Sequence, residues 1–214
     1  MQEGFFSNLA ALNEPPMPKQ EEKMDGLIHE IEIRRAKRAL SEENIPDEKL
    51  RRIMTAATYA PSCFNNQPWR FVVVNERSQL EGLHEALSPG NYWVKKAPAV
   101  VVVATKPDLD ARLSDRREYA LLGCGLATEN LMLQAYKEGV IAHAIAGFDP
   151  LVVKKKFGMP EEYIVITLVA LGYPGDESHL NEKHLALEHS PRQRKPELEV
   201  ICWNTWSFRD SKPV

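Results

Sequence analysis

A short turn at residues 60–69 holds the densest set of groups in the chain that could bind a ligand. Pro61 and Pro68 restrict its backbone. Between them stand a hydroxyl, a thiol and three amides: Ser62, Cys63, Asn65, Asn66 and Gln67. The turn offers neutral donors and acceptors beside the apolar run at 71–74, so it suits the rim of a planar ligand rich in heteroatoms. A tight turn whose amides cap the neighbouring elements explains the same residues equally well.

Two clusters of cationic residues form a second candidate for a ligand-binding site. The first run comprises Arg34, Arg35, Ala36, Lys37 and Arg38, and the second comprises Arg192, Gln193, Arg194 and Lys195. The planar fork of arginine donates two hydrogen bonds at once to a phosphate, so the two clusters could converge on one phosphate. The alternative for the first cluster is that its cations complement the macrodipole at the end of a helix.

The remaining polar residues give no indication of an active site in which side chains carry out the reaction. Gly123, Cys124 and Gly125 are similar to the start of a dinucleotide-binding fingerprint, but they lie in the middle of a helical pattern, which favours close helix packing. His143 lies in an apolar run and is expected to be a core or interface histidine. Cys63 has no base or cation nearby, and the histidines lack the spacing of metal ligands. The absence of an obvious acid, base or nucleophile is itself a clue, because enzymes whose chemistry is carried by a cofactor need the protein only to bind, orient and tune it.

Composition indicates an ordinary soluble globular protein. The chain has 214 residues, 43% of them hydrophobic and 27% charged, with a net charge of −3. No global field would attract nucleic acid or an anionic membrane. The three cysteines lack a CxxC spacing, which favours a reducing compartment over a disulfide framework. The apolar residues near position 5 make a poor signal peptide, so we expect a cytoplasmic protein.

The elements that must position these groups follow from periodicity. Helices are expected at 27–39, from a cap at Asp47, at 116–137 before Gly139, and between Asp149 and Gly158. Strands are expected at 71–74, 99–104 and 164–171. The 116–137 helix is apolar on more than one side, which indicates burial on several faces or against a partner subunit. We expect a loosely held arm at 1–25, one domain at 26–200 whose sheet is covered by helices on both faces, and an extension at 201–214.

The chain resembles the flavin-dependent nitroreductase family over about residues 31–200. The motifs that carry the resemblance are RRAKR at 34–38, APSCFNNQPW at 60–69, AGFDP at 146–150, ALGYP at 170–174 and RQRKP at 192–196. The resemblance implies an α+β fold with three α-β-α layers, in which helices cover a mixed sheet. It also implies an interleaved homodimer that binds FMN noncovalently at its interface.

The resemblance further implies a role for each site residue. Arg34, with Arg192 and Arg194, would grip the phosphate, and Arg38 would reach the pyrimidine side of the flavin. The loop at 61–65 would come from the second subunit and bond the edge of the ring. The full set of expected cofactor-binding residues is Arg34, Arg35, Ala36, Arg38, Pro61, Ser62, Cys63, Asn65, Gln67, Ala146, Gly147, Arg192 and Arg194.

Three details complete this assignment. The backbone amides of Ala146 and Gly147 would face flavin O4 and N5. Ala36 departs from the family pattern, which usually has Ser or Thr there, so one hydroxyl contact to the phosphate is missing. A cation that some relatives supply after the first strand has only Lys95 or Lys96 as candidates.

The activity implied is a ping-pong oxidoreduction. NAD(P)H would give hydride to FMN N5, and an electron-poor acceptor such as a nitroaromatic or a quinone would take it, with no catalytic side chain. Two alternatives stay open. One is a specialised relative that fragments flavin, dehalogenates its substrate or oxidises a heterocycle, with a lid from residues 90–93 or the C-terminal arm. The other is a protein that stores FMN without turnover.

Overall fold

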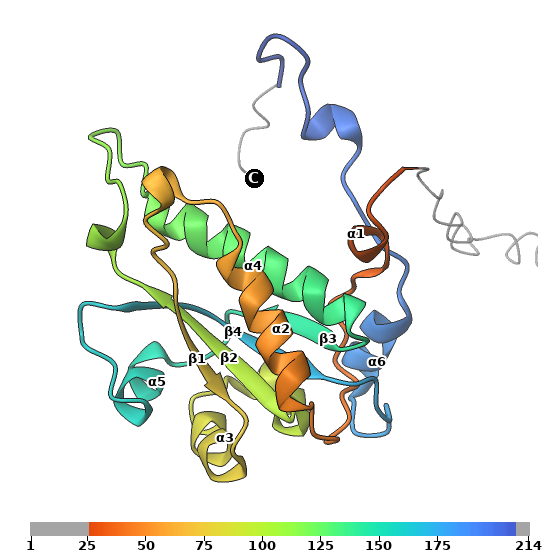
Figure 1. Cartoon of the computed structure of the whole chain (residues 1–214). Helices are drawn as coiled ribbons and strands as arrows, with labels where there is room; N and C mark the ends of the chain where they lie inside the picture. The colour runs from red at the N-terminus through yellow and green to blue at the C-terminus, as the bar shows by residue number, and fades with distance from the viewer. Residues whose placement is uncertain (1–25, 209–214) are drawn as a thin grey trace, which may run out of the picture. The chain divides into compact units, whose positions relative to one another are not determined.

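A four-stranded antiparallel sheet forms the centre of the Gly26–His189 unit (Figure 1). The computed structural model describes residues 26–208. The strands are β1 (Arg70–Val74), β2 (Ala99–Thr105), β3 (Ile141–Ile145) and β4 (Ile164–Gly172). They lie in the order β1-β2-β4-β3, so β1 and β3 are the two edges. The register pairs Val72 with Val102, Val101 with Val169, and His143 with Ala170.

Helices cover both faces of this sheet because its side chains alternate between two apolar clusters. Val100 and Val102 of β2 pack in the cluster that includes α3 (Arg77–His84), α5 (Pro150–Lys156) and the 3₁₀ segment η2 (Pro89–Lys96). Val101 and Val103 pack in the cluster that includes α2 (Asp47–Thr58) and α4 (Tyr119–Lys137). Figure 1 shows α2 and α4 together on one side of the sheet and α3 and α5 on the other. The expected three-layer α-β-α fold is confirmed.

The strand pairing differs from the expected mixed sheet. Every pairing within residues 26–208 is antiparallel. A continuous run of buried valine shows that both faces of a strand are covered, but it does not determine the direction of its neighbours. The three expected strands are confirmed, whereas β3 was missed, since its five residues include the polar His143.

The expected helices α4 and α5 are confirmed, although α4 begins at Tyr119 and not at Arg116. The Asp149 carboxylate caps α5 by accepting from the backbone N–H of Leu151, at 2.8 Å, and of Val152, at 3.3 Å. Beyond α4 and α5 the chain turns at Gly139 and Gly158, whose positive φ values of 74° and 60° favour glycine. The second helix is also confirmed as α2, although Pro46, not Asp47, occupies its N-cap position.

The expected helix at 27–39 is wrong in its second half. Helix α1 spans only His29–Ile33, and the chain leaves it at Arg34 with a ψ of 125°. The reason is tertiary: residues 35–39 hydrogen-bond to side chains more than 100 positions away instead of to their own helix. Helix α6 (Glu182–His189), which supplies one of those side chains, was not expected.

The other described elements are short 3₁₀ segments: η1 (Cys63–Asn65), η3 (Pro107–Leu109) and η4 (Glu197–Glu199). Residues 190–208, which include η4, belong to a second unit. The expected arm at 1–25 lies outside the described residues, and the expected boundary at 200 stays a prediction. None of the helices within residues 26–208 is long and apolar enough to cross a membrane.

Candidate functional site

The basic segment, residues 34–39, is extended chain whose backbone is held by distant side chains. Tyr136 of α4 bonds Arg35 twice, because its hydroxyl accepts from the Arg35 N–H at 2.9 Å and donates to the Arg35 carbonyl. His143 of β3 places Nδ1 2.9 Å from the Lys37 carbonyl. A carbonyl can only accept, so Nδ1 carries the proton.

Glu188 of α6 completes this support of the basic segment. Its side chain is only 3% exposed, although it is a carboxylate. It accepts from the Arg38 N–H at 2.9 Å and from the Ala39 N–H at 3.3 Å. The Lys37 ammonium in turn donates to the backbone carbonyl of Glu188. Three elements far apart in sequence therefore fix the path of the cations.

The cationic side chains lie at the surface above this fixed backbone. The Arg34 Nε lies 3.8 Å from a carboxylate oxygen of Glu129. The Arg38 guanidinium carbon lies 5.9 Å from the ring centroid of Trp93, and its Nη1 donates to the Ala36 carbonyl at 3.3 Å. Both arginines are only partly exposed. Cations held in this way can meet an anion with little loss of side-chain entropy.

The histidine beneath these cations is neutral at pH 7. Burial lowers the pKa of His143 to about 4, the hydrogen bond to Lys37 opposes this shift, and the positive charges of Arg38 and Arg34 add to it. Its ring lies 4.5 Å from that of Trp93. Burial likewise raises the pKa of Tyr136. His143 and Tyr136 therefore act here as hydrogen-bonding groups without charge.

The loop at 61–67 is held mainly by its own turn bonds. The Ser62 hydroxyl accepts from the Gln67 N–H at 2.9 Å, and the Ser62 carbonyl accepts from the Asn65 N–H at 3.1 Å. Phe64, Asn65 and Gln67 have φ values of 48°, 57° and 50°. This left-handed region costs residues other than glycine about 1–2 kcal/mol each. Such strain is concentrated at functional sites.

The loop presents its side chains outward while its base is fixed. Phe64 is 91% exposed, and Pro61, Asn65 and Gln67 are exposed too. At the base, the Asn66 amide donates to Asp110 Oδ1 at 3.0 Å.

Helix α4 also supports this base. A Cβ added at Gly123 would lie 2.9 Å from Pro68 Cγ, whereas one at Gly125 would meet nothing within 4 Å. The expected close helix packing is thus confirmed for Gly123 alone. Burial raises the pKa of the neighbouring Cys124 thiol to about 11, which makes that thiol a poor nucleophile.

A second backbone feature follows β3. The Gly147 carbonyl accepts from the Ser88 N–H at 3.0 Å and from the Asn91 amide at 2.8 Å. A Cβ at Gly147 would lie 2.6 Å from the Asn91 nitrogen, so only glycine fits there without a shift. Within residues 26–208 the N–H groups of Ala146 and Gly147 donate to no backbone or side-chain acceptor. Two donors therefore remain for a ligand.

The structure brings the basic segment and the Ala146–Gly147 pair together. Both adjoin β3, and η2 contacts both, since Trp93 lies beside Arg38 while Asn91 holds Gly147. The loop at 61–67 instead precedes β1, at the opposite edge of the sheet. Arg192 and Arg194 belong to the second unit, so their convergence with Arg34 stays a prediction.

Comparison with known proteins identifies the family. A model described as the nitroreductase family matches residues 31–90 and 85–173. The chain belongs to the nitroreductase family.

Similar proteins and a solved structure support this family membership. A protein of Archaeoglobus fulgidus with the provisional name NADH dehydrogenase/NAD(P)H nitroreductase is 35% identical over 164 residues, which cover 74% of this chain and 91% of that protein. A protein of Thermus thermophilus named NADH dehydrogenase is 32% identical over 206 residues, covering 79% and 92%. A crystal structure of an oxidoreductase containing FMN has a TM-score of 0.76 and 26% identity, covering 89% of this chain and 96% of its own.

In this nitroreductase-family chain, three residues that hold the backbone of the candidate site were not predicted from the sequence. Tyr136 lies in a helix whose apolar pattern hides its hydroxyl, and Asn91 lies in an ordinary Pro-Gly-Asn turn. Glu188 lies in a polar segment where a buried carboxylate has no local signal. Each acts through a backbone group that is distant in sequence, which no spacing pattern reveals.

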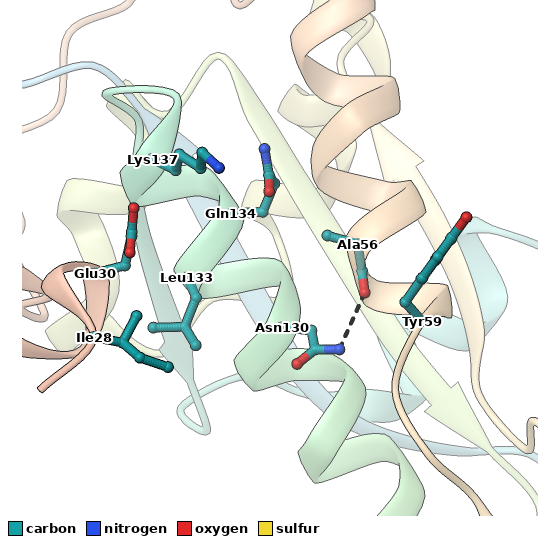
Figure 2. Close-up of a pocket in the computed structure, with 8 residues that line it drawn as sticks. All are labelled: Ile28, Glu30, Ala56, Tyr59, Asn130, Leu133, Gln134 and Lys137. Carbon is teal, nitrogen blue, oxygen red and sulfur yellow. Dashed lines mark hydrogen bonds between the residues drawn. The ribbon is translucent and has the colours of Figure 1, made fainter.

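A pocket of about 330 Å³, lined by none of these groups, lies between α1, α2 and α4 (Figure 2). Its lining residues are Ile28, Glu30, Ala56, Tyr59, Asn130, Leu133, Gln134 and Lys137. None of them was expected to bind a cofactor. Within it the Asn130 amide donates to the Ala56 carbonyl at 3.2 Å, and Ile28 and Tyr59 are 61% and 80% exposed. The pocket is therefore part of an open, largely apolar surface.

Proposed function

We propose that the chain is an FMN-dependent oxidoreductase that passes hydride from NAD(P)H to an electron-poor acceptor such as a nitroaromatic or a quinone. The observation that carries the proposal is the pair of unbonded N–H groups at Ala146 and Gly147 beside the fixed cations of the basic segment. The relatives named NADH dehydrogenase and the neighbour that contains FMN support it.

The residues present fit the chemistry of FMN. Its phosphate is an anion, which Arg34 can bind from one side, with Arg192 and Arg194 as the expected further partners. Arg35 and Ala36 supply the backbone between Arg34 and the pyrimidine side of the site. When bound, the flavin would accept hydride from NAD(P)H at N5 and deliver it to the acceptor. The chain itself binds, orients and tunes this group.

Two parts of the chain would contact the flavin ring. The N–H groups of Ala146 and Gly147 would donate to O4 and N5, and the absence of a Cβ at Gly147 lets the Asn91 amide hold this turn in place. The Arg38 guanidinium would stabilise the negative charge of the reduced pyrimidine. Fixed donors aimed at developing charge need no reorganisation during reaction.

A second copy of the chain would complete the site. The outward groups of the 61–67 loop cannot serve the same chain's cations easily, since β1 and β3 are opposite edges of the sheet. We propose that Pro61, Ser62, Cys63, Asn65 and Gln67 reach the flavin of a partner protomer in a homodimer. Exposed apolar side chains on α4, at Leu121, Leu122 and Leu126, and the surface in Figure 2 support such an interface.

The test begins with the colour of the purified protein and identification of any released chromophore. Anaerobic mixing with NADH and with NADPH should bleach the yellow flavin, and initial rates with a quinone should give parallel double-reciprocal lines. A colourless monomer that ignores added FMN would overturn the proposal. Flavin that neither cofactor reduces would favour storage, and flavin destroyed in the presence of oxygen would favour fragmentation. A cytoplasmic location stays a prediction.

A further inference from the structure

Glu188 has an unusual environment for a carboxylate. It is 3% exposed, and its two oxygens accept from the consecutive N–H groups of Arg38 and Ala39. Burial of a carboxylate is costly unless charged or polar partners compensate it. Here the bonds are made to the backbone of Arg38, and the guanidinium of that residue is bonded only to the Ala36 carbonyl among the hydrogen bonds of residues 26–208. Glu188 thus holds the cation without occupying its donors.

Helix α6, which carries Glu188, is itself tied to η2. The Tyr92 hydroxyl accepts from the Asn181 N–H at 2.8 Å and lies 3.2 Å from His184 Nδ1. The rings of Tyr92 and His184 are stacked with centroids 5.4 Å apart. His184 precedes Glu188 by one helical turn. The next residue of η2, Trp93, lies beside the Arg38 guanidinium.

These contacts close a ring of interactions around Arg38. Its backbone is held by Glu188, and its side chain lies beside Trp93. Tyr92 then connects η2 back to α6. Two independent anchors of one arginine fix both where its chain runs and where its charge lies.

We propose that Glu188 is a positioning residue of the flavin site, which places the Arg38 guanidinium for its contact with the pyrimidine side of FMN. The inference rests on the proposed function. Glu188 touches neither the flavin nor the substrate, and it acts through Arg38.

A double-mutant cycle tests the proposal through FMN affinity, measured by flavin fluorescence with flavin-free protein. Glu188→Gln should weaken FMN binding about tenfold, since a neutral amide cannot accept from both N–H groups. In the Arg38→Ala background the same change should have no further effect, because Glu188 acts through the missing side chain. Glu188→Asp, which keeps the charge, should recover most of the affinity. The control Glu182→Gln, at an exposed site of the same helix, should bind as the natural chain does.

Hydrogen exchange in the flavin-free protein gives a readout independent of activity. The amides of Arg38 and Ala39 should exchange faster in Glu188→Gln and at the natural rate in Glu182→Gln. Equal losses of FMN affinity with and without Arg38, or no loss at all, would overturn the inference while FMN binding itself stands. If the natural chain binds no FMN, the proposed function fails first. Should Glu188→Gln not fold, Glu188→Asp, whose shorter side chain should cause a smaller loss of FMN affinity, replaces it, and that smaller loss should likewise vanish in the Arg38→Ala background.

Discussion

The basic segment and the 61–67 loop carry most of the expected flavin contacts, but they are held in opposite ways. The basic segment has a few local hydrogen bonds, such as that from the Lys37 N–H to the Arg35 carbonyl. It is held mainly by Tyr136, His143 and Glu188, each more than 100 positions away. The loop closes on itself through Ser62 and stores backbone strain at residues with positive φ. The basic segment therefore depends mainly on tertiary contacts, whereas the 61–67 loop depends mainly on hydrogen bonds among its own residues.

This difference has a functional meaning. Cations that must meet a phosphate at a fixed place gain from anchors in several elements. A loop proposed to reach into another protomer gains from an exposed part that is held mainly by its own turn bonds, with Asp110 and α4 supporting only its base. Substitutions far away should therefore disturb mainly the first region, whereas local ones should disturb mainly the second.

The largest effect is expected for Tyr136→Phe. The change removes the hydroxyl that bonds both backbone groups of Arg35, so it should lower the free energy of unfolding by about 2–3 kcal/mol and weaken FMN binding. Urea unfolding monitored by circular dichroism measures the change. Tyr163→Phe, whose hydroxyl makes no hydrogen bond within residues 26–208, is the control. Equal effects of the two substitutions would contradict the idea that remote anchors hold the basic segment.

Acid should loosen the same segment through His143. Its folded pKa of about 4 lies below the ordinary value of 6.5, so the unfolded chain binds the proton more tightly. Stability is complete above pH 6.5 and falls as the pH drops toward 4, by about 2 kcal/mol at pH 5. His143→Asn keeps a donor for the Lys37 carbonyl but cannot titrate. The free energy of unfolding, measured at pH 7 and pH 5, should fall less in this variant than in the natural chain. An equal fall in both proteins would show that His143 does not cause the loss of stability in acid.

Ser62→Ala should produce a smaller and strictly local effect. The hydroxyl accepts one hydrogen bond from the Gln67 N–H, and its loss should cost about 1 kcal/mol. Hydrogen exchange should rise at residues 62–67 and stay unchanged at 34–39. Ser78→Ala, at an exposed site on α3, serves as the control. Faster exchange that spreads to the basic segment would show that the two regions are coupled within one chain.

The smallest effect is expected for Cys63→Ala. Cys63 lies within the strained turn, and the proposed chemistry gives its thiol no covalent role. The variant should keep FMN and most of its turnover with a quinone. Complete loss of reductase activity with flavin still bound would assign the thiol a chemical role after all.

Much of the framework was predictable because its signals are local. The caps and turns at Asp149, Gly139 and Gly158 mark where helices begin and end, and runs of valine mark the buried strands. The five motifs at 34–38, 60–69, 146–150, 170–174 and 192–196 together were sufficient to indicate the family. The helix expected at 27–39 was too long, because residues after Ile33 find hydrogen-bond partners elsewhere in the fold.

By itself the amino-acid sequence determined the family and the three-layer order, and it supplied the residue types of the candidate site. Propensity, capping and turn chemistry act between near neighbours, so a sequence states them directly. Only the tertiary structure decided that Glu188, Tyr136 and His143 hold the cations and that Asn91 holds Gly147. Those bonds join backbone groups to side chains from distant elements, and no local pattern records which of them the packed core brings within reach.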